Sequence, residues 1–246
     1  IISCGRKSVV PSIFLKKNSK KKIINIHIQN PKISLKNFDF VIIPDHDGIS
    51  GSNVINTKGA IHYLTNKEIN DSKDYLLNKI EKNKDVITLV LGGPTKDYNY
   101  SNNNMLDIFS KINKRLKEYN LQLVIIPSNR TPKKTIQLAK EFFSEGCIVI
   151  DKVDKSAYLS SLALAKYIIV TCDSTSMISE AALTGKPLYV AMIPPLRNDT
   201  RFEKFRNLFE RLNIIKKLED KLETWNYEKL NEADRIASEI KKKINQ

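Results

Sequence analysis

Residues Tyr167–Pro195, YIIVTCDSTSMISEAALTGKPLYVAMIPP, decide the fold. The β-branched run Ile168–Val170 predicts a short strand that is buried on both faces. The small polar residues Asp173–Ser176 then favour a turn and a helix cap. A helical pattern follows over Met177–Gly185, and Leu188–Met192 predicts the next strand. The stretch is therefore a strand-loop-helix-strand unit, the building block of a parallel α/β sheet.

The loop of this unit places hydroxyl groups and unpaired backbone N–H groups at the start of a helix. Such an end suits a phosphate group, so Asp173, Ser174, Thr175 and Ser176 are candidate nucleotide-binding residues. Glu180 lies four residues after Ser176 on the same helix face, where its carboxylate can accept hydrogen bonds from both hydroxyls of a ribose. The alternative is structural: Ser176 caps the helix and Glu180 complements the helix dipole.

The rest of the chain alternates strand and helix patterns. Six further strands are predicted, at Ile1–Cys4, Ile23–Gln29, Phe38–Pro44, Val86–Leu91, Leu121–Ile126 and Cys147–Ile150. Helices are predicted at Val9–Lys17, Asn66–Lys82, Met105–Tyr119, Lys133–Ser144, Tyr158–Lys166 and Asn231–Ile244. The segment with Asn53, Thr57, Gly59 and His62 has a polar, irregular pattern, and the chain after Pro195 has a polar, helical one. Repeated strand-helix units predict parallel sheets with helices on both faces.

The charged run Lys82–Asp85 precedes a fresh strand and is the best candidate for a domain boundary. We therefore expect two Rossmann-like lobes, residues 1–82 and residues 83–246, the second including the C-terminal helices. The chain begins with Ile1 rather than Met, and IISCG has the pattern of the end of a strand. We therefore expect the first lobe to be truncated and the chain to be the C-terminal part of a longer protein.

The composition limits the classes of partner. A formal charge of +14 normally suggests a nucleic-acid partner or an anionic surface. However, 33 of the 41 basic residues are lysine, and the dense cluster at Lys16–Lys22, KKNSKKK, has no aromatic residues between its lysines. We interpret that cluster as a solvated helix end and expect no nucleic-acid partner.

The cysteines and the hydropathy indicate the compartment. Cys4, Cys147 and Cys172 are widely spaced and odd in number, which argues for a reducing compartment, the cytoplasm, and against a disulfide framework or a zinc site. No apolar run approaches the ~18–20 residues of a membrane span, and no secretory signal is visible.

Loops rich in glycine, charged or hydroxyl residues follow the carboxyl ends of several predicted strands. Ligands of parallel α/β folds bind at the carboxyl ends of the strands. The loops at these ends are Gly5-Arg6, Asp45-His46-Asp47, Gly92-Gly93, Ser128 with Arg130 and Thr131, and Asp173–Ser176. Their coincidence is a stronger signal than any single motif, and Gly92-Gly93 with Arg130 predicts an anion site in the second lobe.

An ordered set of motifs resembles one known family. The motifs are GRKS at Gly5, IQNP at Gln29, FDFVIIPDHD at Phe38, NVINTKGAIH at Asn53, LGGP at Leu91, SNRTP at Ser128 and VTCDSTSMISEAALTGKPLYV at Val170. Over Ile1–Pro195 the chain resembles the mitochondrial-fission family named for elongated mitochondria, which occurs in plants and bacteria, and its lysine-rich composition is typical of a bacterial member. Family members usually begin with a further strand-helix stretch.

That family is similar to GT-B glycosyltransferases, which hold a nucleotide-sugar between two Rossmann-like domains, mostly on the second. The resemblance implies that Gly92 and Gly93 approach the diphosphate and that Glu180 holds the ribose. It also implies that Gly5, Arg6 and the Asp45-His46-Asp47 loop face the acceptor, which would be lipid-linked and would bring the protein to a membrane surface. No further cofactor is expected.

His46 is the best candidate for a general base. Sugar transfer to a hydroxyl needs a group with a near-neutral pKa to take the proton, and the flanking Asp45 and Asp47 favour imidazolium. One His between two Asp lacks a convincing metal geometry, so no metal is expected. The alternative is a loop that hydrogen-bonds to itself.

Two classes of function remain open from the sequence. The first is a nucleotide-sugar-dependent glycosyltransferase, or a nucleotide-sugar-binding relative of one. The second is a non-catalytic interaction protein that recruits a partner in membrane or organelle fission, as plant members of the family do. Arg130, Asp173, Ser176 and Glu180 around one pocket favour the first class.

Overall fold

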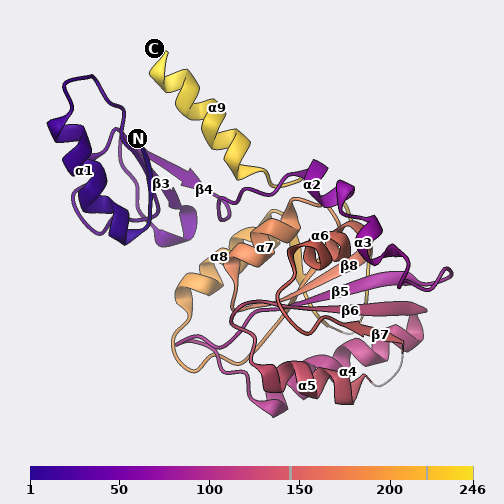
Figure 1. Ribbon diagram of the computed structural model, residues 1–246. Coiled ribbons are helices and arrows are strands. Elements are labelled where there is room, and N and C mark those ends of the chain that lie inside the picture. The colour runs from indigo at the N-terminus through magenta and orange to yellow at the C-terminus, as the bar shows by residue number, and fades with distance from the viewer. Residues whose placement is uncertain (144–145, 220, 246) are drawn as a thin grey trace. The chain divides into compact units, whose positions relative to one another are not determined.

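A computed structural model describes residues 1–143, 146–219 and 221–245. The chain divides into two compact units. Unit 1 contains Ile1–Ile61 together with Asn231–Gln246, and unit 2 contains His62–Leu230. Each unit has its own parallel sheet (Figure 1).

Unit 1 is a four-stranded sheet covered on both faces. Its strands, in spatial order, are β1 (Ile2–Cys4), β2 (Ile26–Ile28), β3 (Phe40–Pro44) and β4 (Val54–Thr57). Its helices are α1 (Val9–Asn18) and α9 (Glu232–Ile244), with short 3₁₀ turns η1 (Arg6–Ser8), η2 (Leu35–Asn37) and η3 (Asp45–Asp47). Val9 of α1 packs with Val41 and Ile43 on one face of the sheet. Ile236 and Ile240 of α9, four residues apart, pack with β3 and β4 on the other.

Unit 2 is built around a six-stranded parallel sheet. In spatial order its strands are β10 (Ile215–Lys217), β9 (Leu188–Ala191), β8 (Ala165–Thr171), β5 (Asp85–Leu91), β6 (Leu121–Pro127) and β7 (Cys147–Val149). Its helices are α2 (Asn66–Asp71), α3 (Asp74–Leu77), α4 (Asn102–Glu118), α5 (Lys133–Phe142), α6 (Lys155–Leu164), α7 (Thr175–Ala182) and α8 (Thr200–Arg211). Helices α4 and α5 lie on one face of this sheet, and α6, α7 and α8 lie on the other (Figure 1).

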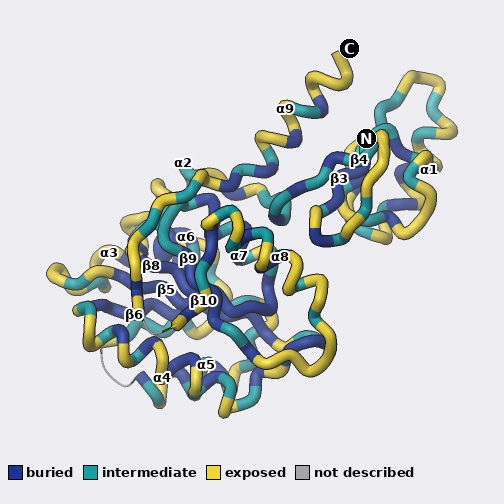
Figure 2. The backbone as a smooth tube through the Cα atoms, turned by 180° about the vertical axis from the view of Figure 1, so that it is seen from behind, coloured by how far each residue is buried: buried dark blue, intermediate teal, exposed yellow. Residues whose placement is uncertain are grey.

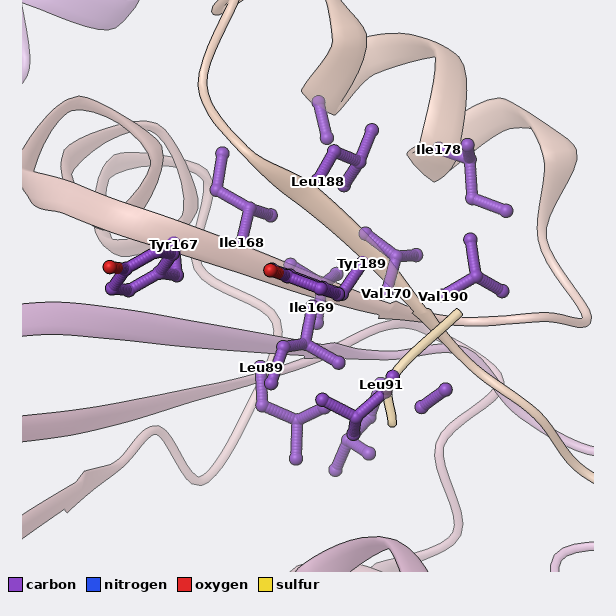
Figure 3. Packing of buried hydrophobic residues seen from close by; sticks show 14 of the residues in the cluster. Leu89, Leu91, Tyr167, Ile168, Ile169, Val170, Ile178, Leu188, Tyr189 and Val190 are labelled. Atoms are coloured by element: carbon purple, nitrogen blue, oxygen red, sulfur yellow. The ribbon is translucent and has the colours of Figure 1, made fainter. Parts of the chain in front are cut away.

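The core of unit 2 forms because its central strands are apolar on both faces. Ile168, Ile169 and Val170 of β8 are completely buried, as are Leu89 of β5 and Leu188 of β9. Figure 3 shows Ile168, Val170 and Leu188 on the side of the sheet where Ile178 of α7 lies, with Ile169 and Leu89 on the opposite side. Figure 2 shows that the central strands of unit 2 are buried and that the outer turns are exposed. The continuous apolar run of β8 predicted a strand buried on both faces, and the packing of β8 confirms that prediction.

The predicted fold class, α/β with two Rossmann-like units and parallel sheets, is confirmed. The predicted β8-α7-β9 unit is confirmed within a few residues at each end. Three local predictions are wrong. The segment around Asn53 contains strand β4, the chain after Arg211 contains strand β10, and the helix predicted over Asn66–Lys82 is divided into α2 and α3. Ser144, the predicted end of one helix, lies outside the described residues.

The two compact units do not divide at the predicted boundary of Lys82–Asp85. Helix α3 belongs to unit 2 because the Ser160 hydroxyl of α6 donates to Lys73 O at 2.8 Å and accepts from the Leu76 amide at 3.0 Å. The run at Lys82–Asp85 is only the turn into β5. The C-terminal helix α9, which we assigned to the second lobe, completes the core of unit 1.

Candidate functional site

The sheet of unit 2 has one topological switch point. From β5 the chain adds β6 and β7 on one side, and then returns to add β8, β9 and β10 on the other. Strands β5 and β8 pair directly, with Val90 opposite Val170. In open α/β sheets the ligand binds where the strand order reverses, beyond the carboxyl ends of these two strands. The residues that follow them are Gly92-Gly93 and Cys172–Ser174.

The two glycines are required by close contacts. A Cβ on Gly92 would lie 2.1 Å from Asp173 Oδ2, and a Cβ on Gly93 would lie 2.1 Å from the backbone oxygen of Arg130. The Gly92 amide donates to Thr171 Oγ1 at 2.8 Å, and the Gly93 amide donates to Asp173 Oδ2 at 3.0 Å. Gly92-Gly93 therefore joins the ends of β5, β6 and β8, and its amides are already engaged within the protein.

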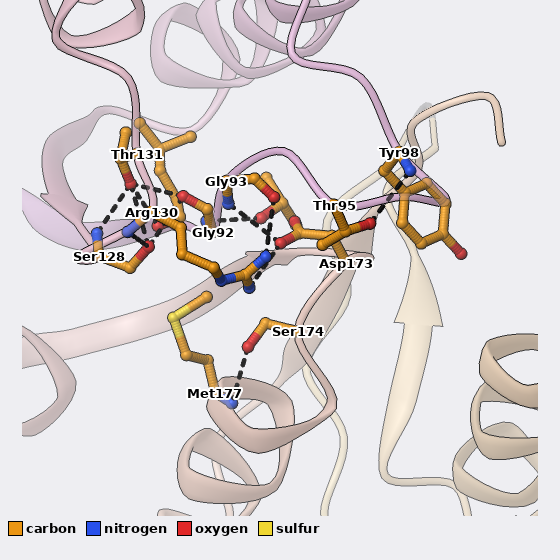
Figure 4. Close-up of polar contacts among 12 residues, drawn as sticks. Gly92, Gly93, Thr95, Tyr98, Ser128, Arg130, Thr131, Asp173, Ser174 and Met177 are labelled. Atoms are coloured by element: carbon orange, nitrogen blue, oxygen red, sulfur yellow. Dashed lines mark hydrogen bonds and ion pairs between the residues drawn. The ribbon is translucent and has the colours of Figure 1, made fainter. Parts of the chain in front are cut away.

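Asp173 is the centre of a buried polar cluster (Figure 4). Its side chain has no exposed surface, and it forms a 2.9 Å ion pair with Arg130, whose side chain is 42% exposed. Arg130 also donates to Gly93 O at 2.9 Å. The Tyr100 hydroxyl lies 2.6 Å from Asp173 Oδ1 and 2.7 Å from Thr171 Oγ1. Burial, together with the Asp173 carboxylate, raises the pKa of Tyr100 and keeps it a hydrogen-bond donor.

Ser128 and Thr131 hold the backbone of the glycine turn. The Ser128 hydroxyl donates to Gly92 O at 2.9 Å, and the Thr131 hydroxyl lies 2.5 Å from the same oxygen. The Ser128 amide donates to Thr131 Oγ1 at 2.8 Å. These two side chains, which we predicted as ligand-binding, are engaged with the protein itself. They position Arg130, which lies between them in the sequence.

Helix α7 begins directly after this cluster. Ser174 is its N-cap, with a long contact of 3.4 Å in which the Met177 amide donates to Ser174 Oγ. The structural alternative gave this cap to Ser176, which instead lies in the first turn and is exposed. The amides of Thr175 and Ser176 belong to the first turn, where the helix supplies no acceptor. Figure 4 shows the Arg130 guanidinium between the glycine turn and Ser174.

Glu180 lies on α7 and is half-buried. Its Oε2 accepts a hydrogen bond from the Tyr158 hydroxyl at 2.8 Å. Burial raises the pKa of Glu180, while the Tyr158 hydrogen bond and the nearby His62 oppose that shift. Both carboxylate oxygens have lone pairs left for further donors. The sequence did not indicate Tyr158, because 22 positions separate it from Glu180.

A second network, which sequence analysis missed, joins the loop after β5 to the loop after β9. Tyr98 donates to Asp199 Oδ2 at 2.5 Å, and Arg206 bonds both Tyr98 Oη and Asp199 at 2.8 Å. Arg197 pairs with Asp97 at 2.6 Å. About a hundred positions separate the two loops, so no local pattern could have paired them.

The predicted acceptor-side residues all lie in unit 1. Gly5, with φ of 76°, and the exposed Arg6 follow β1, and η3 (Asp45–Asp47) follows β3. The His46 side chain is only 3% exposed, and its Nε2 lies 3.8 Å from Asp47 Oδ1. Asp45, by contrast, is exposed. The structure therefore brings Asp45, His46 and Asp47 into one turn but turns the imidazole into the protein.

The described His, Cys, Asp and Glu side chains offer no metal site, and Cys147 and Cys172 are not reactive thiols. In the described part of the chain, no group of three or more His, Cys, Asp or Glu side chains could hold a metal ion. Burial raises the pKa of Cys147 to about 12 and that of Cys172 to about 11, so neither is a reactive thiolate at neutral pH. Across residues 1–143, 146–219 and 221–245, no helix is both long and apolar enough to cross a membrane.

Two parallel sheets, with a glycine turn and a helix N-terminus flanking the switch point of one of them, define a GT-B-like, Rossmann-type protein. The family model for mitochondrial fission ELM1 matches residues 1–244, so the chain belongs to that family. It is 27% identical over 279 aligned positions to the uncharacterized protein RP120 of Rickettsia prowazekii, covering 98% of this chain and 78% of the relative. It is 22% identical over 280 positions to the mitochondrial fission protein ELM1 of Arabidopsis thaliana, covering 99% of this chain and 63% of that protein's length.

Solved structures share the fold at low sequence identity. The UDP-GlcNAc 2-epimerase of Methanocaldococcus jannaschii aligns with 98% of this chain and 76% of its own, at 14% identity and a TM-score of 0.55. The Neisseria meningitidis epimerase bound to UDP-GlcNAc gives the same coverages, at 15% identity and a TM-score of 0.54. MurG of Acinetobacter baumannii aligns with 88% of this chain and 59% of its own, at 11% identity and a TM-score of 0.51.

Proposed function

We propose that the chain binds a nucleoside-diphosphate sugar at the carboxyl edge of the unit 2 sheet and acts as a glycosyltransferase-like protein. One observation carries the proposal: Arg130 pairs with Asp173 just after β8, directly before the start of α7, the helix that carries Glu180. This is the place where parallel α/β sheets bind nucleotides.

The diphosphate is assigned to Arg130 and α7. The amides of Gly92 and Gly93 are engaged with Thr171 and Asp173, so the glycines act by allowing Asp173 and Arg130 to approach. One edge of the Arg130 guanidinium is occupied by Asp173, and much of the side chain remains exposed. A guanidinium next to a helix N-terminus attracts phosphate oxygens.

The ribose is assigned to Glu180. Its carboxylate oxygens can accept from two adjacent hydroxyls while Oε2 also accepts from Tyr158. The Tyr158 hydroxyl fixes the orientation of this carboxylate before any ligand binds. A uridine diphosphate sugar is the donor we propose, because the Neisseria structure, of the same fold, is bound to UDP-GlcNAc.

Transfer of the sugar is the second step of the proposal. It would use a lipid-linked acceptor, with the protein located in the cytoplasm of a bacterium and peripheral at the membrane. His46 has the right kind of side chain for a general base, but it is 3% exposed and must move to meet a substrate. The first claim to test is therefore the binding of the nucleotide-sugar, and sugar transfer comes after it.

The test is titration of the full-length protein with UDP-GlcNAc by calorimetry. Hydrogen bonds to a charged group contribute roughly 1.5–3 kcal/mol, so Glu180→Ala should weaken binding by about 10- to 150-fold. Glu180→Gln keeps an acceptor for Tyr158 and should lose less stability than Glu180→Ala. Glu141→Gln, at an exposed position at the end of α5, is the matched control and should bind normally.

The outcomes are distinct. Equal affinities for wild type and both Glu180 variants would remove Glu180 from the site. Failure of the wild type to bind UDP-, GDP- or CMP-linked sugars would overturn the proposal and favour the second candidate, an interaction protein that recruits a partner in fission. The similarity to the mitochondrial fission protein ELM1 of Arabidopsis favours that candidate.

A further inference from the structure

Helix α1 of unit 1 has apolar side chains on its outer face. Its inner face, with Val9, Ser12 and Ile13, packs toward the sheet. On the outer face, Val10 is 73% exposed and Phe14 is 63% exposed, and these two lie four residues apart on one side of the helix. Figure 2 shows α1 largely exposed.

The outer face of α9, the other described α-helix of unit 1, differs. In α9 the residues between the buried Ile236 and Ile240 are charged or small, and Lys241, Lys242 and Lys243 follow them. Helices of soluble domains usually place polar residues outward, and contiguous exposed apolar groups mark interaction surfaces. The outer face of α1 is therefore apolar, and none of the described residues covers Val10 and Phe14 there.

A basic cluster follows the exposed apolar residues of α1 in the sequence. Lys16 forms a 2.6 Å ion pair with Asp39. Lys17, Lys20, Lys21 and Lys22 are exposed, and among the described residues no carboxylate pairs with them. Lysines after a helix C-terminus also complement its dipole, in agreement with a solvated helix end. That explains Lys17 in the last turn of α1 but not the exposed Lys20, Lys21 and Lys22 that follow the helix.

We propose that the outer face of α1 and Lys17–Lys22 form a docking surface for an anionic lipid membrane. Apolar side chains that enter the acyl boundary beside lysines that meet lipid phosphates are the features of interfacial binding. A second copy of this chain is disfavoured, because each chain has a net charge of +14 and the copies would repel each other. This surface would mediate the peripheral membrane association of the proposed function. Vesicle binding can be measured without a nucleotide, so it tests the surface independently of the nucleotide site.

The experiment is flotation of the full-length protein with vesicles of phosphatidylcholine alone or of phosphatidylcholine with phosphatidylglycerol. Binding is expected only to the anionic vesicles, and added salt should weaken it. The triple variant Lys20→Gln, Lys21→Gln, Lys22→Gln should bind on the order of 100-fold less tightly, about 5-fold for each lysine lost. The pair Val10→Ser, Phe14→Ser should bind more than about 10-fold less tightly.

A matched basic cluster on α9 provides the control. The variant Lys241→Gln, Lys242→Gln, Lys243→Gln removes the same charge from unit 1 and should bind anionic vesicles nearly as well as wild type. Equal losses in both triple variants would mean that only net charge matters, and the surface would be rejected. Absence of vesicle binding, or a dimer that Phe14→Ser dissociates, would also overturn the proposal. Circular dichroism checks that each variant folds.

Discussion

The strand ends of the two units are organised differently. In unit 2 the loops after β5, β6 and β8 are tied to one another, since Arg130 bonds Gly93 and Asp173 and the Ser128 hydroxyl bonds Gly92. In unit 1 the η1 turn is closed by local bonds, such as that from Ser8 Oγ to Cys4 O at 2.8 Å, and Asn56 of β4 donates to Ile49 O after η3 at 3.0 Å. The edge of unit 2 is thus set in place before a ligand arrives, which lowers the cost of binding there.

The cores of the two units differ as well. Unit 2 has a large core built from helices on both faces of six strands. Unit 1 has four strands, and α9 packs on one face of its sheet. In the sequence, the whole of unit 2 lies between β4 and α9. This difference predicts that the two units will respond unequally to substitutions.

The largest effect is expected at Ile236, which is 3% exposed in the core of unit 1. Ile236→Ala should destabilise unit 1 by about 2–5 kcal/mol, because it leaves a cavity against β3 and β4. The single tryptophan, Trp225, belongs to unit 2, so its fluorescence should keep its urea midpoint while circular dichroism shows an earlier transition.

Ile244 is the control for that experiment, since it lies on the same helix and is 44% exposed. Ile244→Ala should change stability by no more than about 0.5 kcal/mol. If Ile236→Ala shifts both signals together, the two units unfold as one cooperative body and do not differ in their response to substitutions.

The next effect concerns glycines at the strand ends. Gly93→Ala places a methyl group against the Arg130 backbone and should cost about 1–3 kcal/mol, seen as an earlier Trp225 transition. Gly48 in unit 1 has no heavy atom within 4 Å of an added Cβ, but its φ is +66°. Gly48→Ala should therefore cost only the left-handed strain of about 1–2 kcal/mol and should leave the Trp225 transition unchanged. A stable Gly93→Ala protein would show that the glycine turn is not sterically fixed.

Sequence patterns predicted the central architecture because its causes are local. The β-branched run of β8 and the stop at Gly185 define the β8-α7-β9 unit without reference to any other segment. Strand β4 was missed because Asn53 and Asn56 make its pattern polar, and the side chain of Asn53 in fact donates to Leu35 O and Phe38 O. The short strand β10 ends in two lysines and carries little apolar signal.

The sequence predicted where the candidate site lies, but it did not predict which hydrogen bonds its residues form. Strand ends could be located from the sequence, so Gly92, Arg130 and Asp173 could be grouped. Whether a glycine amide faces a ligand or Asp173 depends on how three strands are placed, and no local pattern contains that information. The burial of His46 depends in the same way on the packing of unit 1.

The smallest expected effect is a pH dependence confined to unit 1. His27 is completely buried beside Phe38, its Nδ1 lies 2.8 Å from Ser3 Oγ, and burial lowers its pKa below 6.5. Below pH 6.5 the unfolded chain binds a proton at His27 that the folded chain does not. The contribution of neutral His27 to the free energy of unfolding is therefore fully present above pH 6.5. It is lost as the pH falls, by at most about 1.4 kcal/mol per pH unit. His27→Gln should flatten this dependence in circular dichroism, while the matched change His62→Gln in unit 2 should leave it intact. An unchanged slope in His27→Gln would assign the pH dependence of unit 1 to other groups.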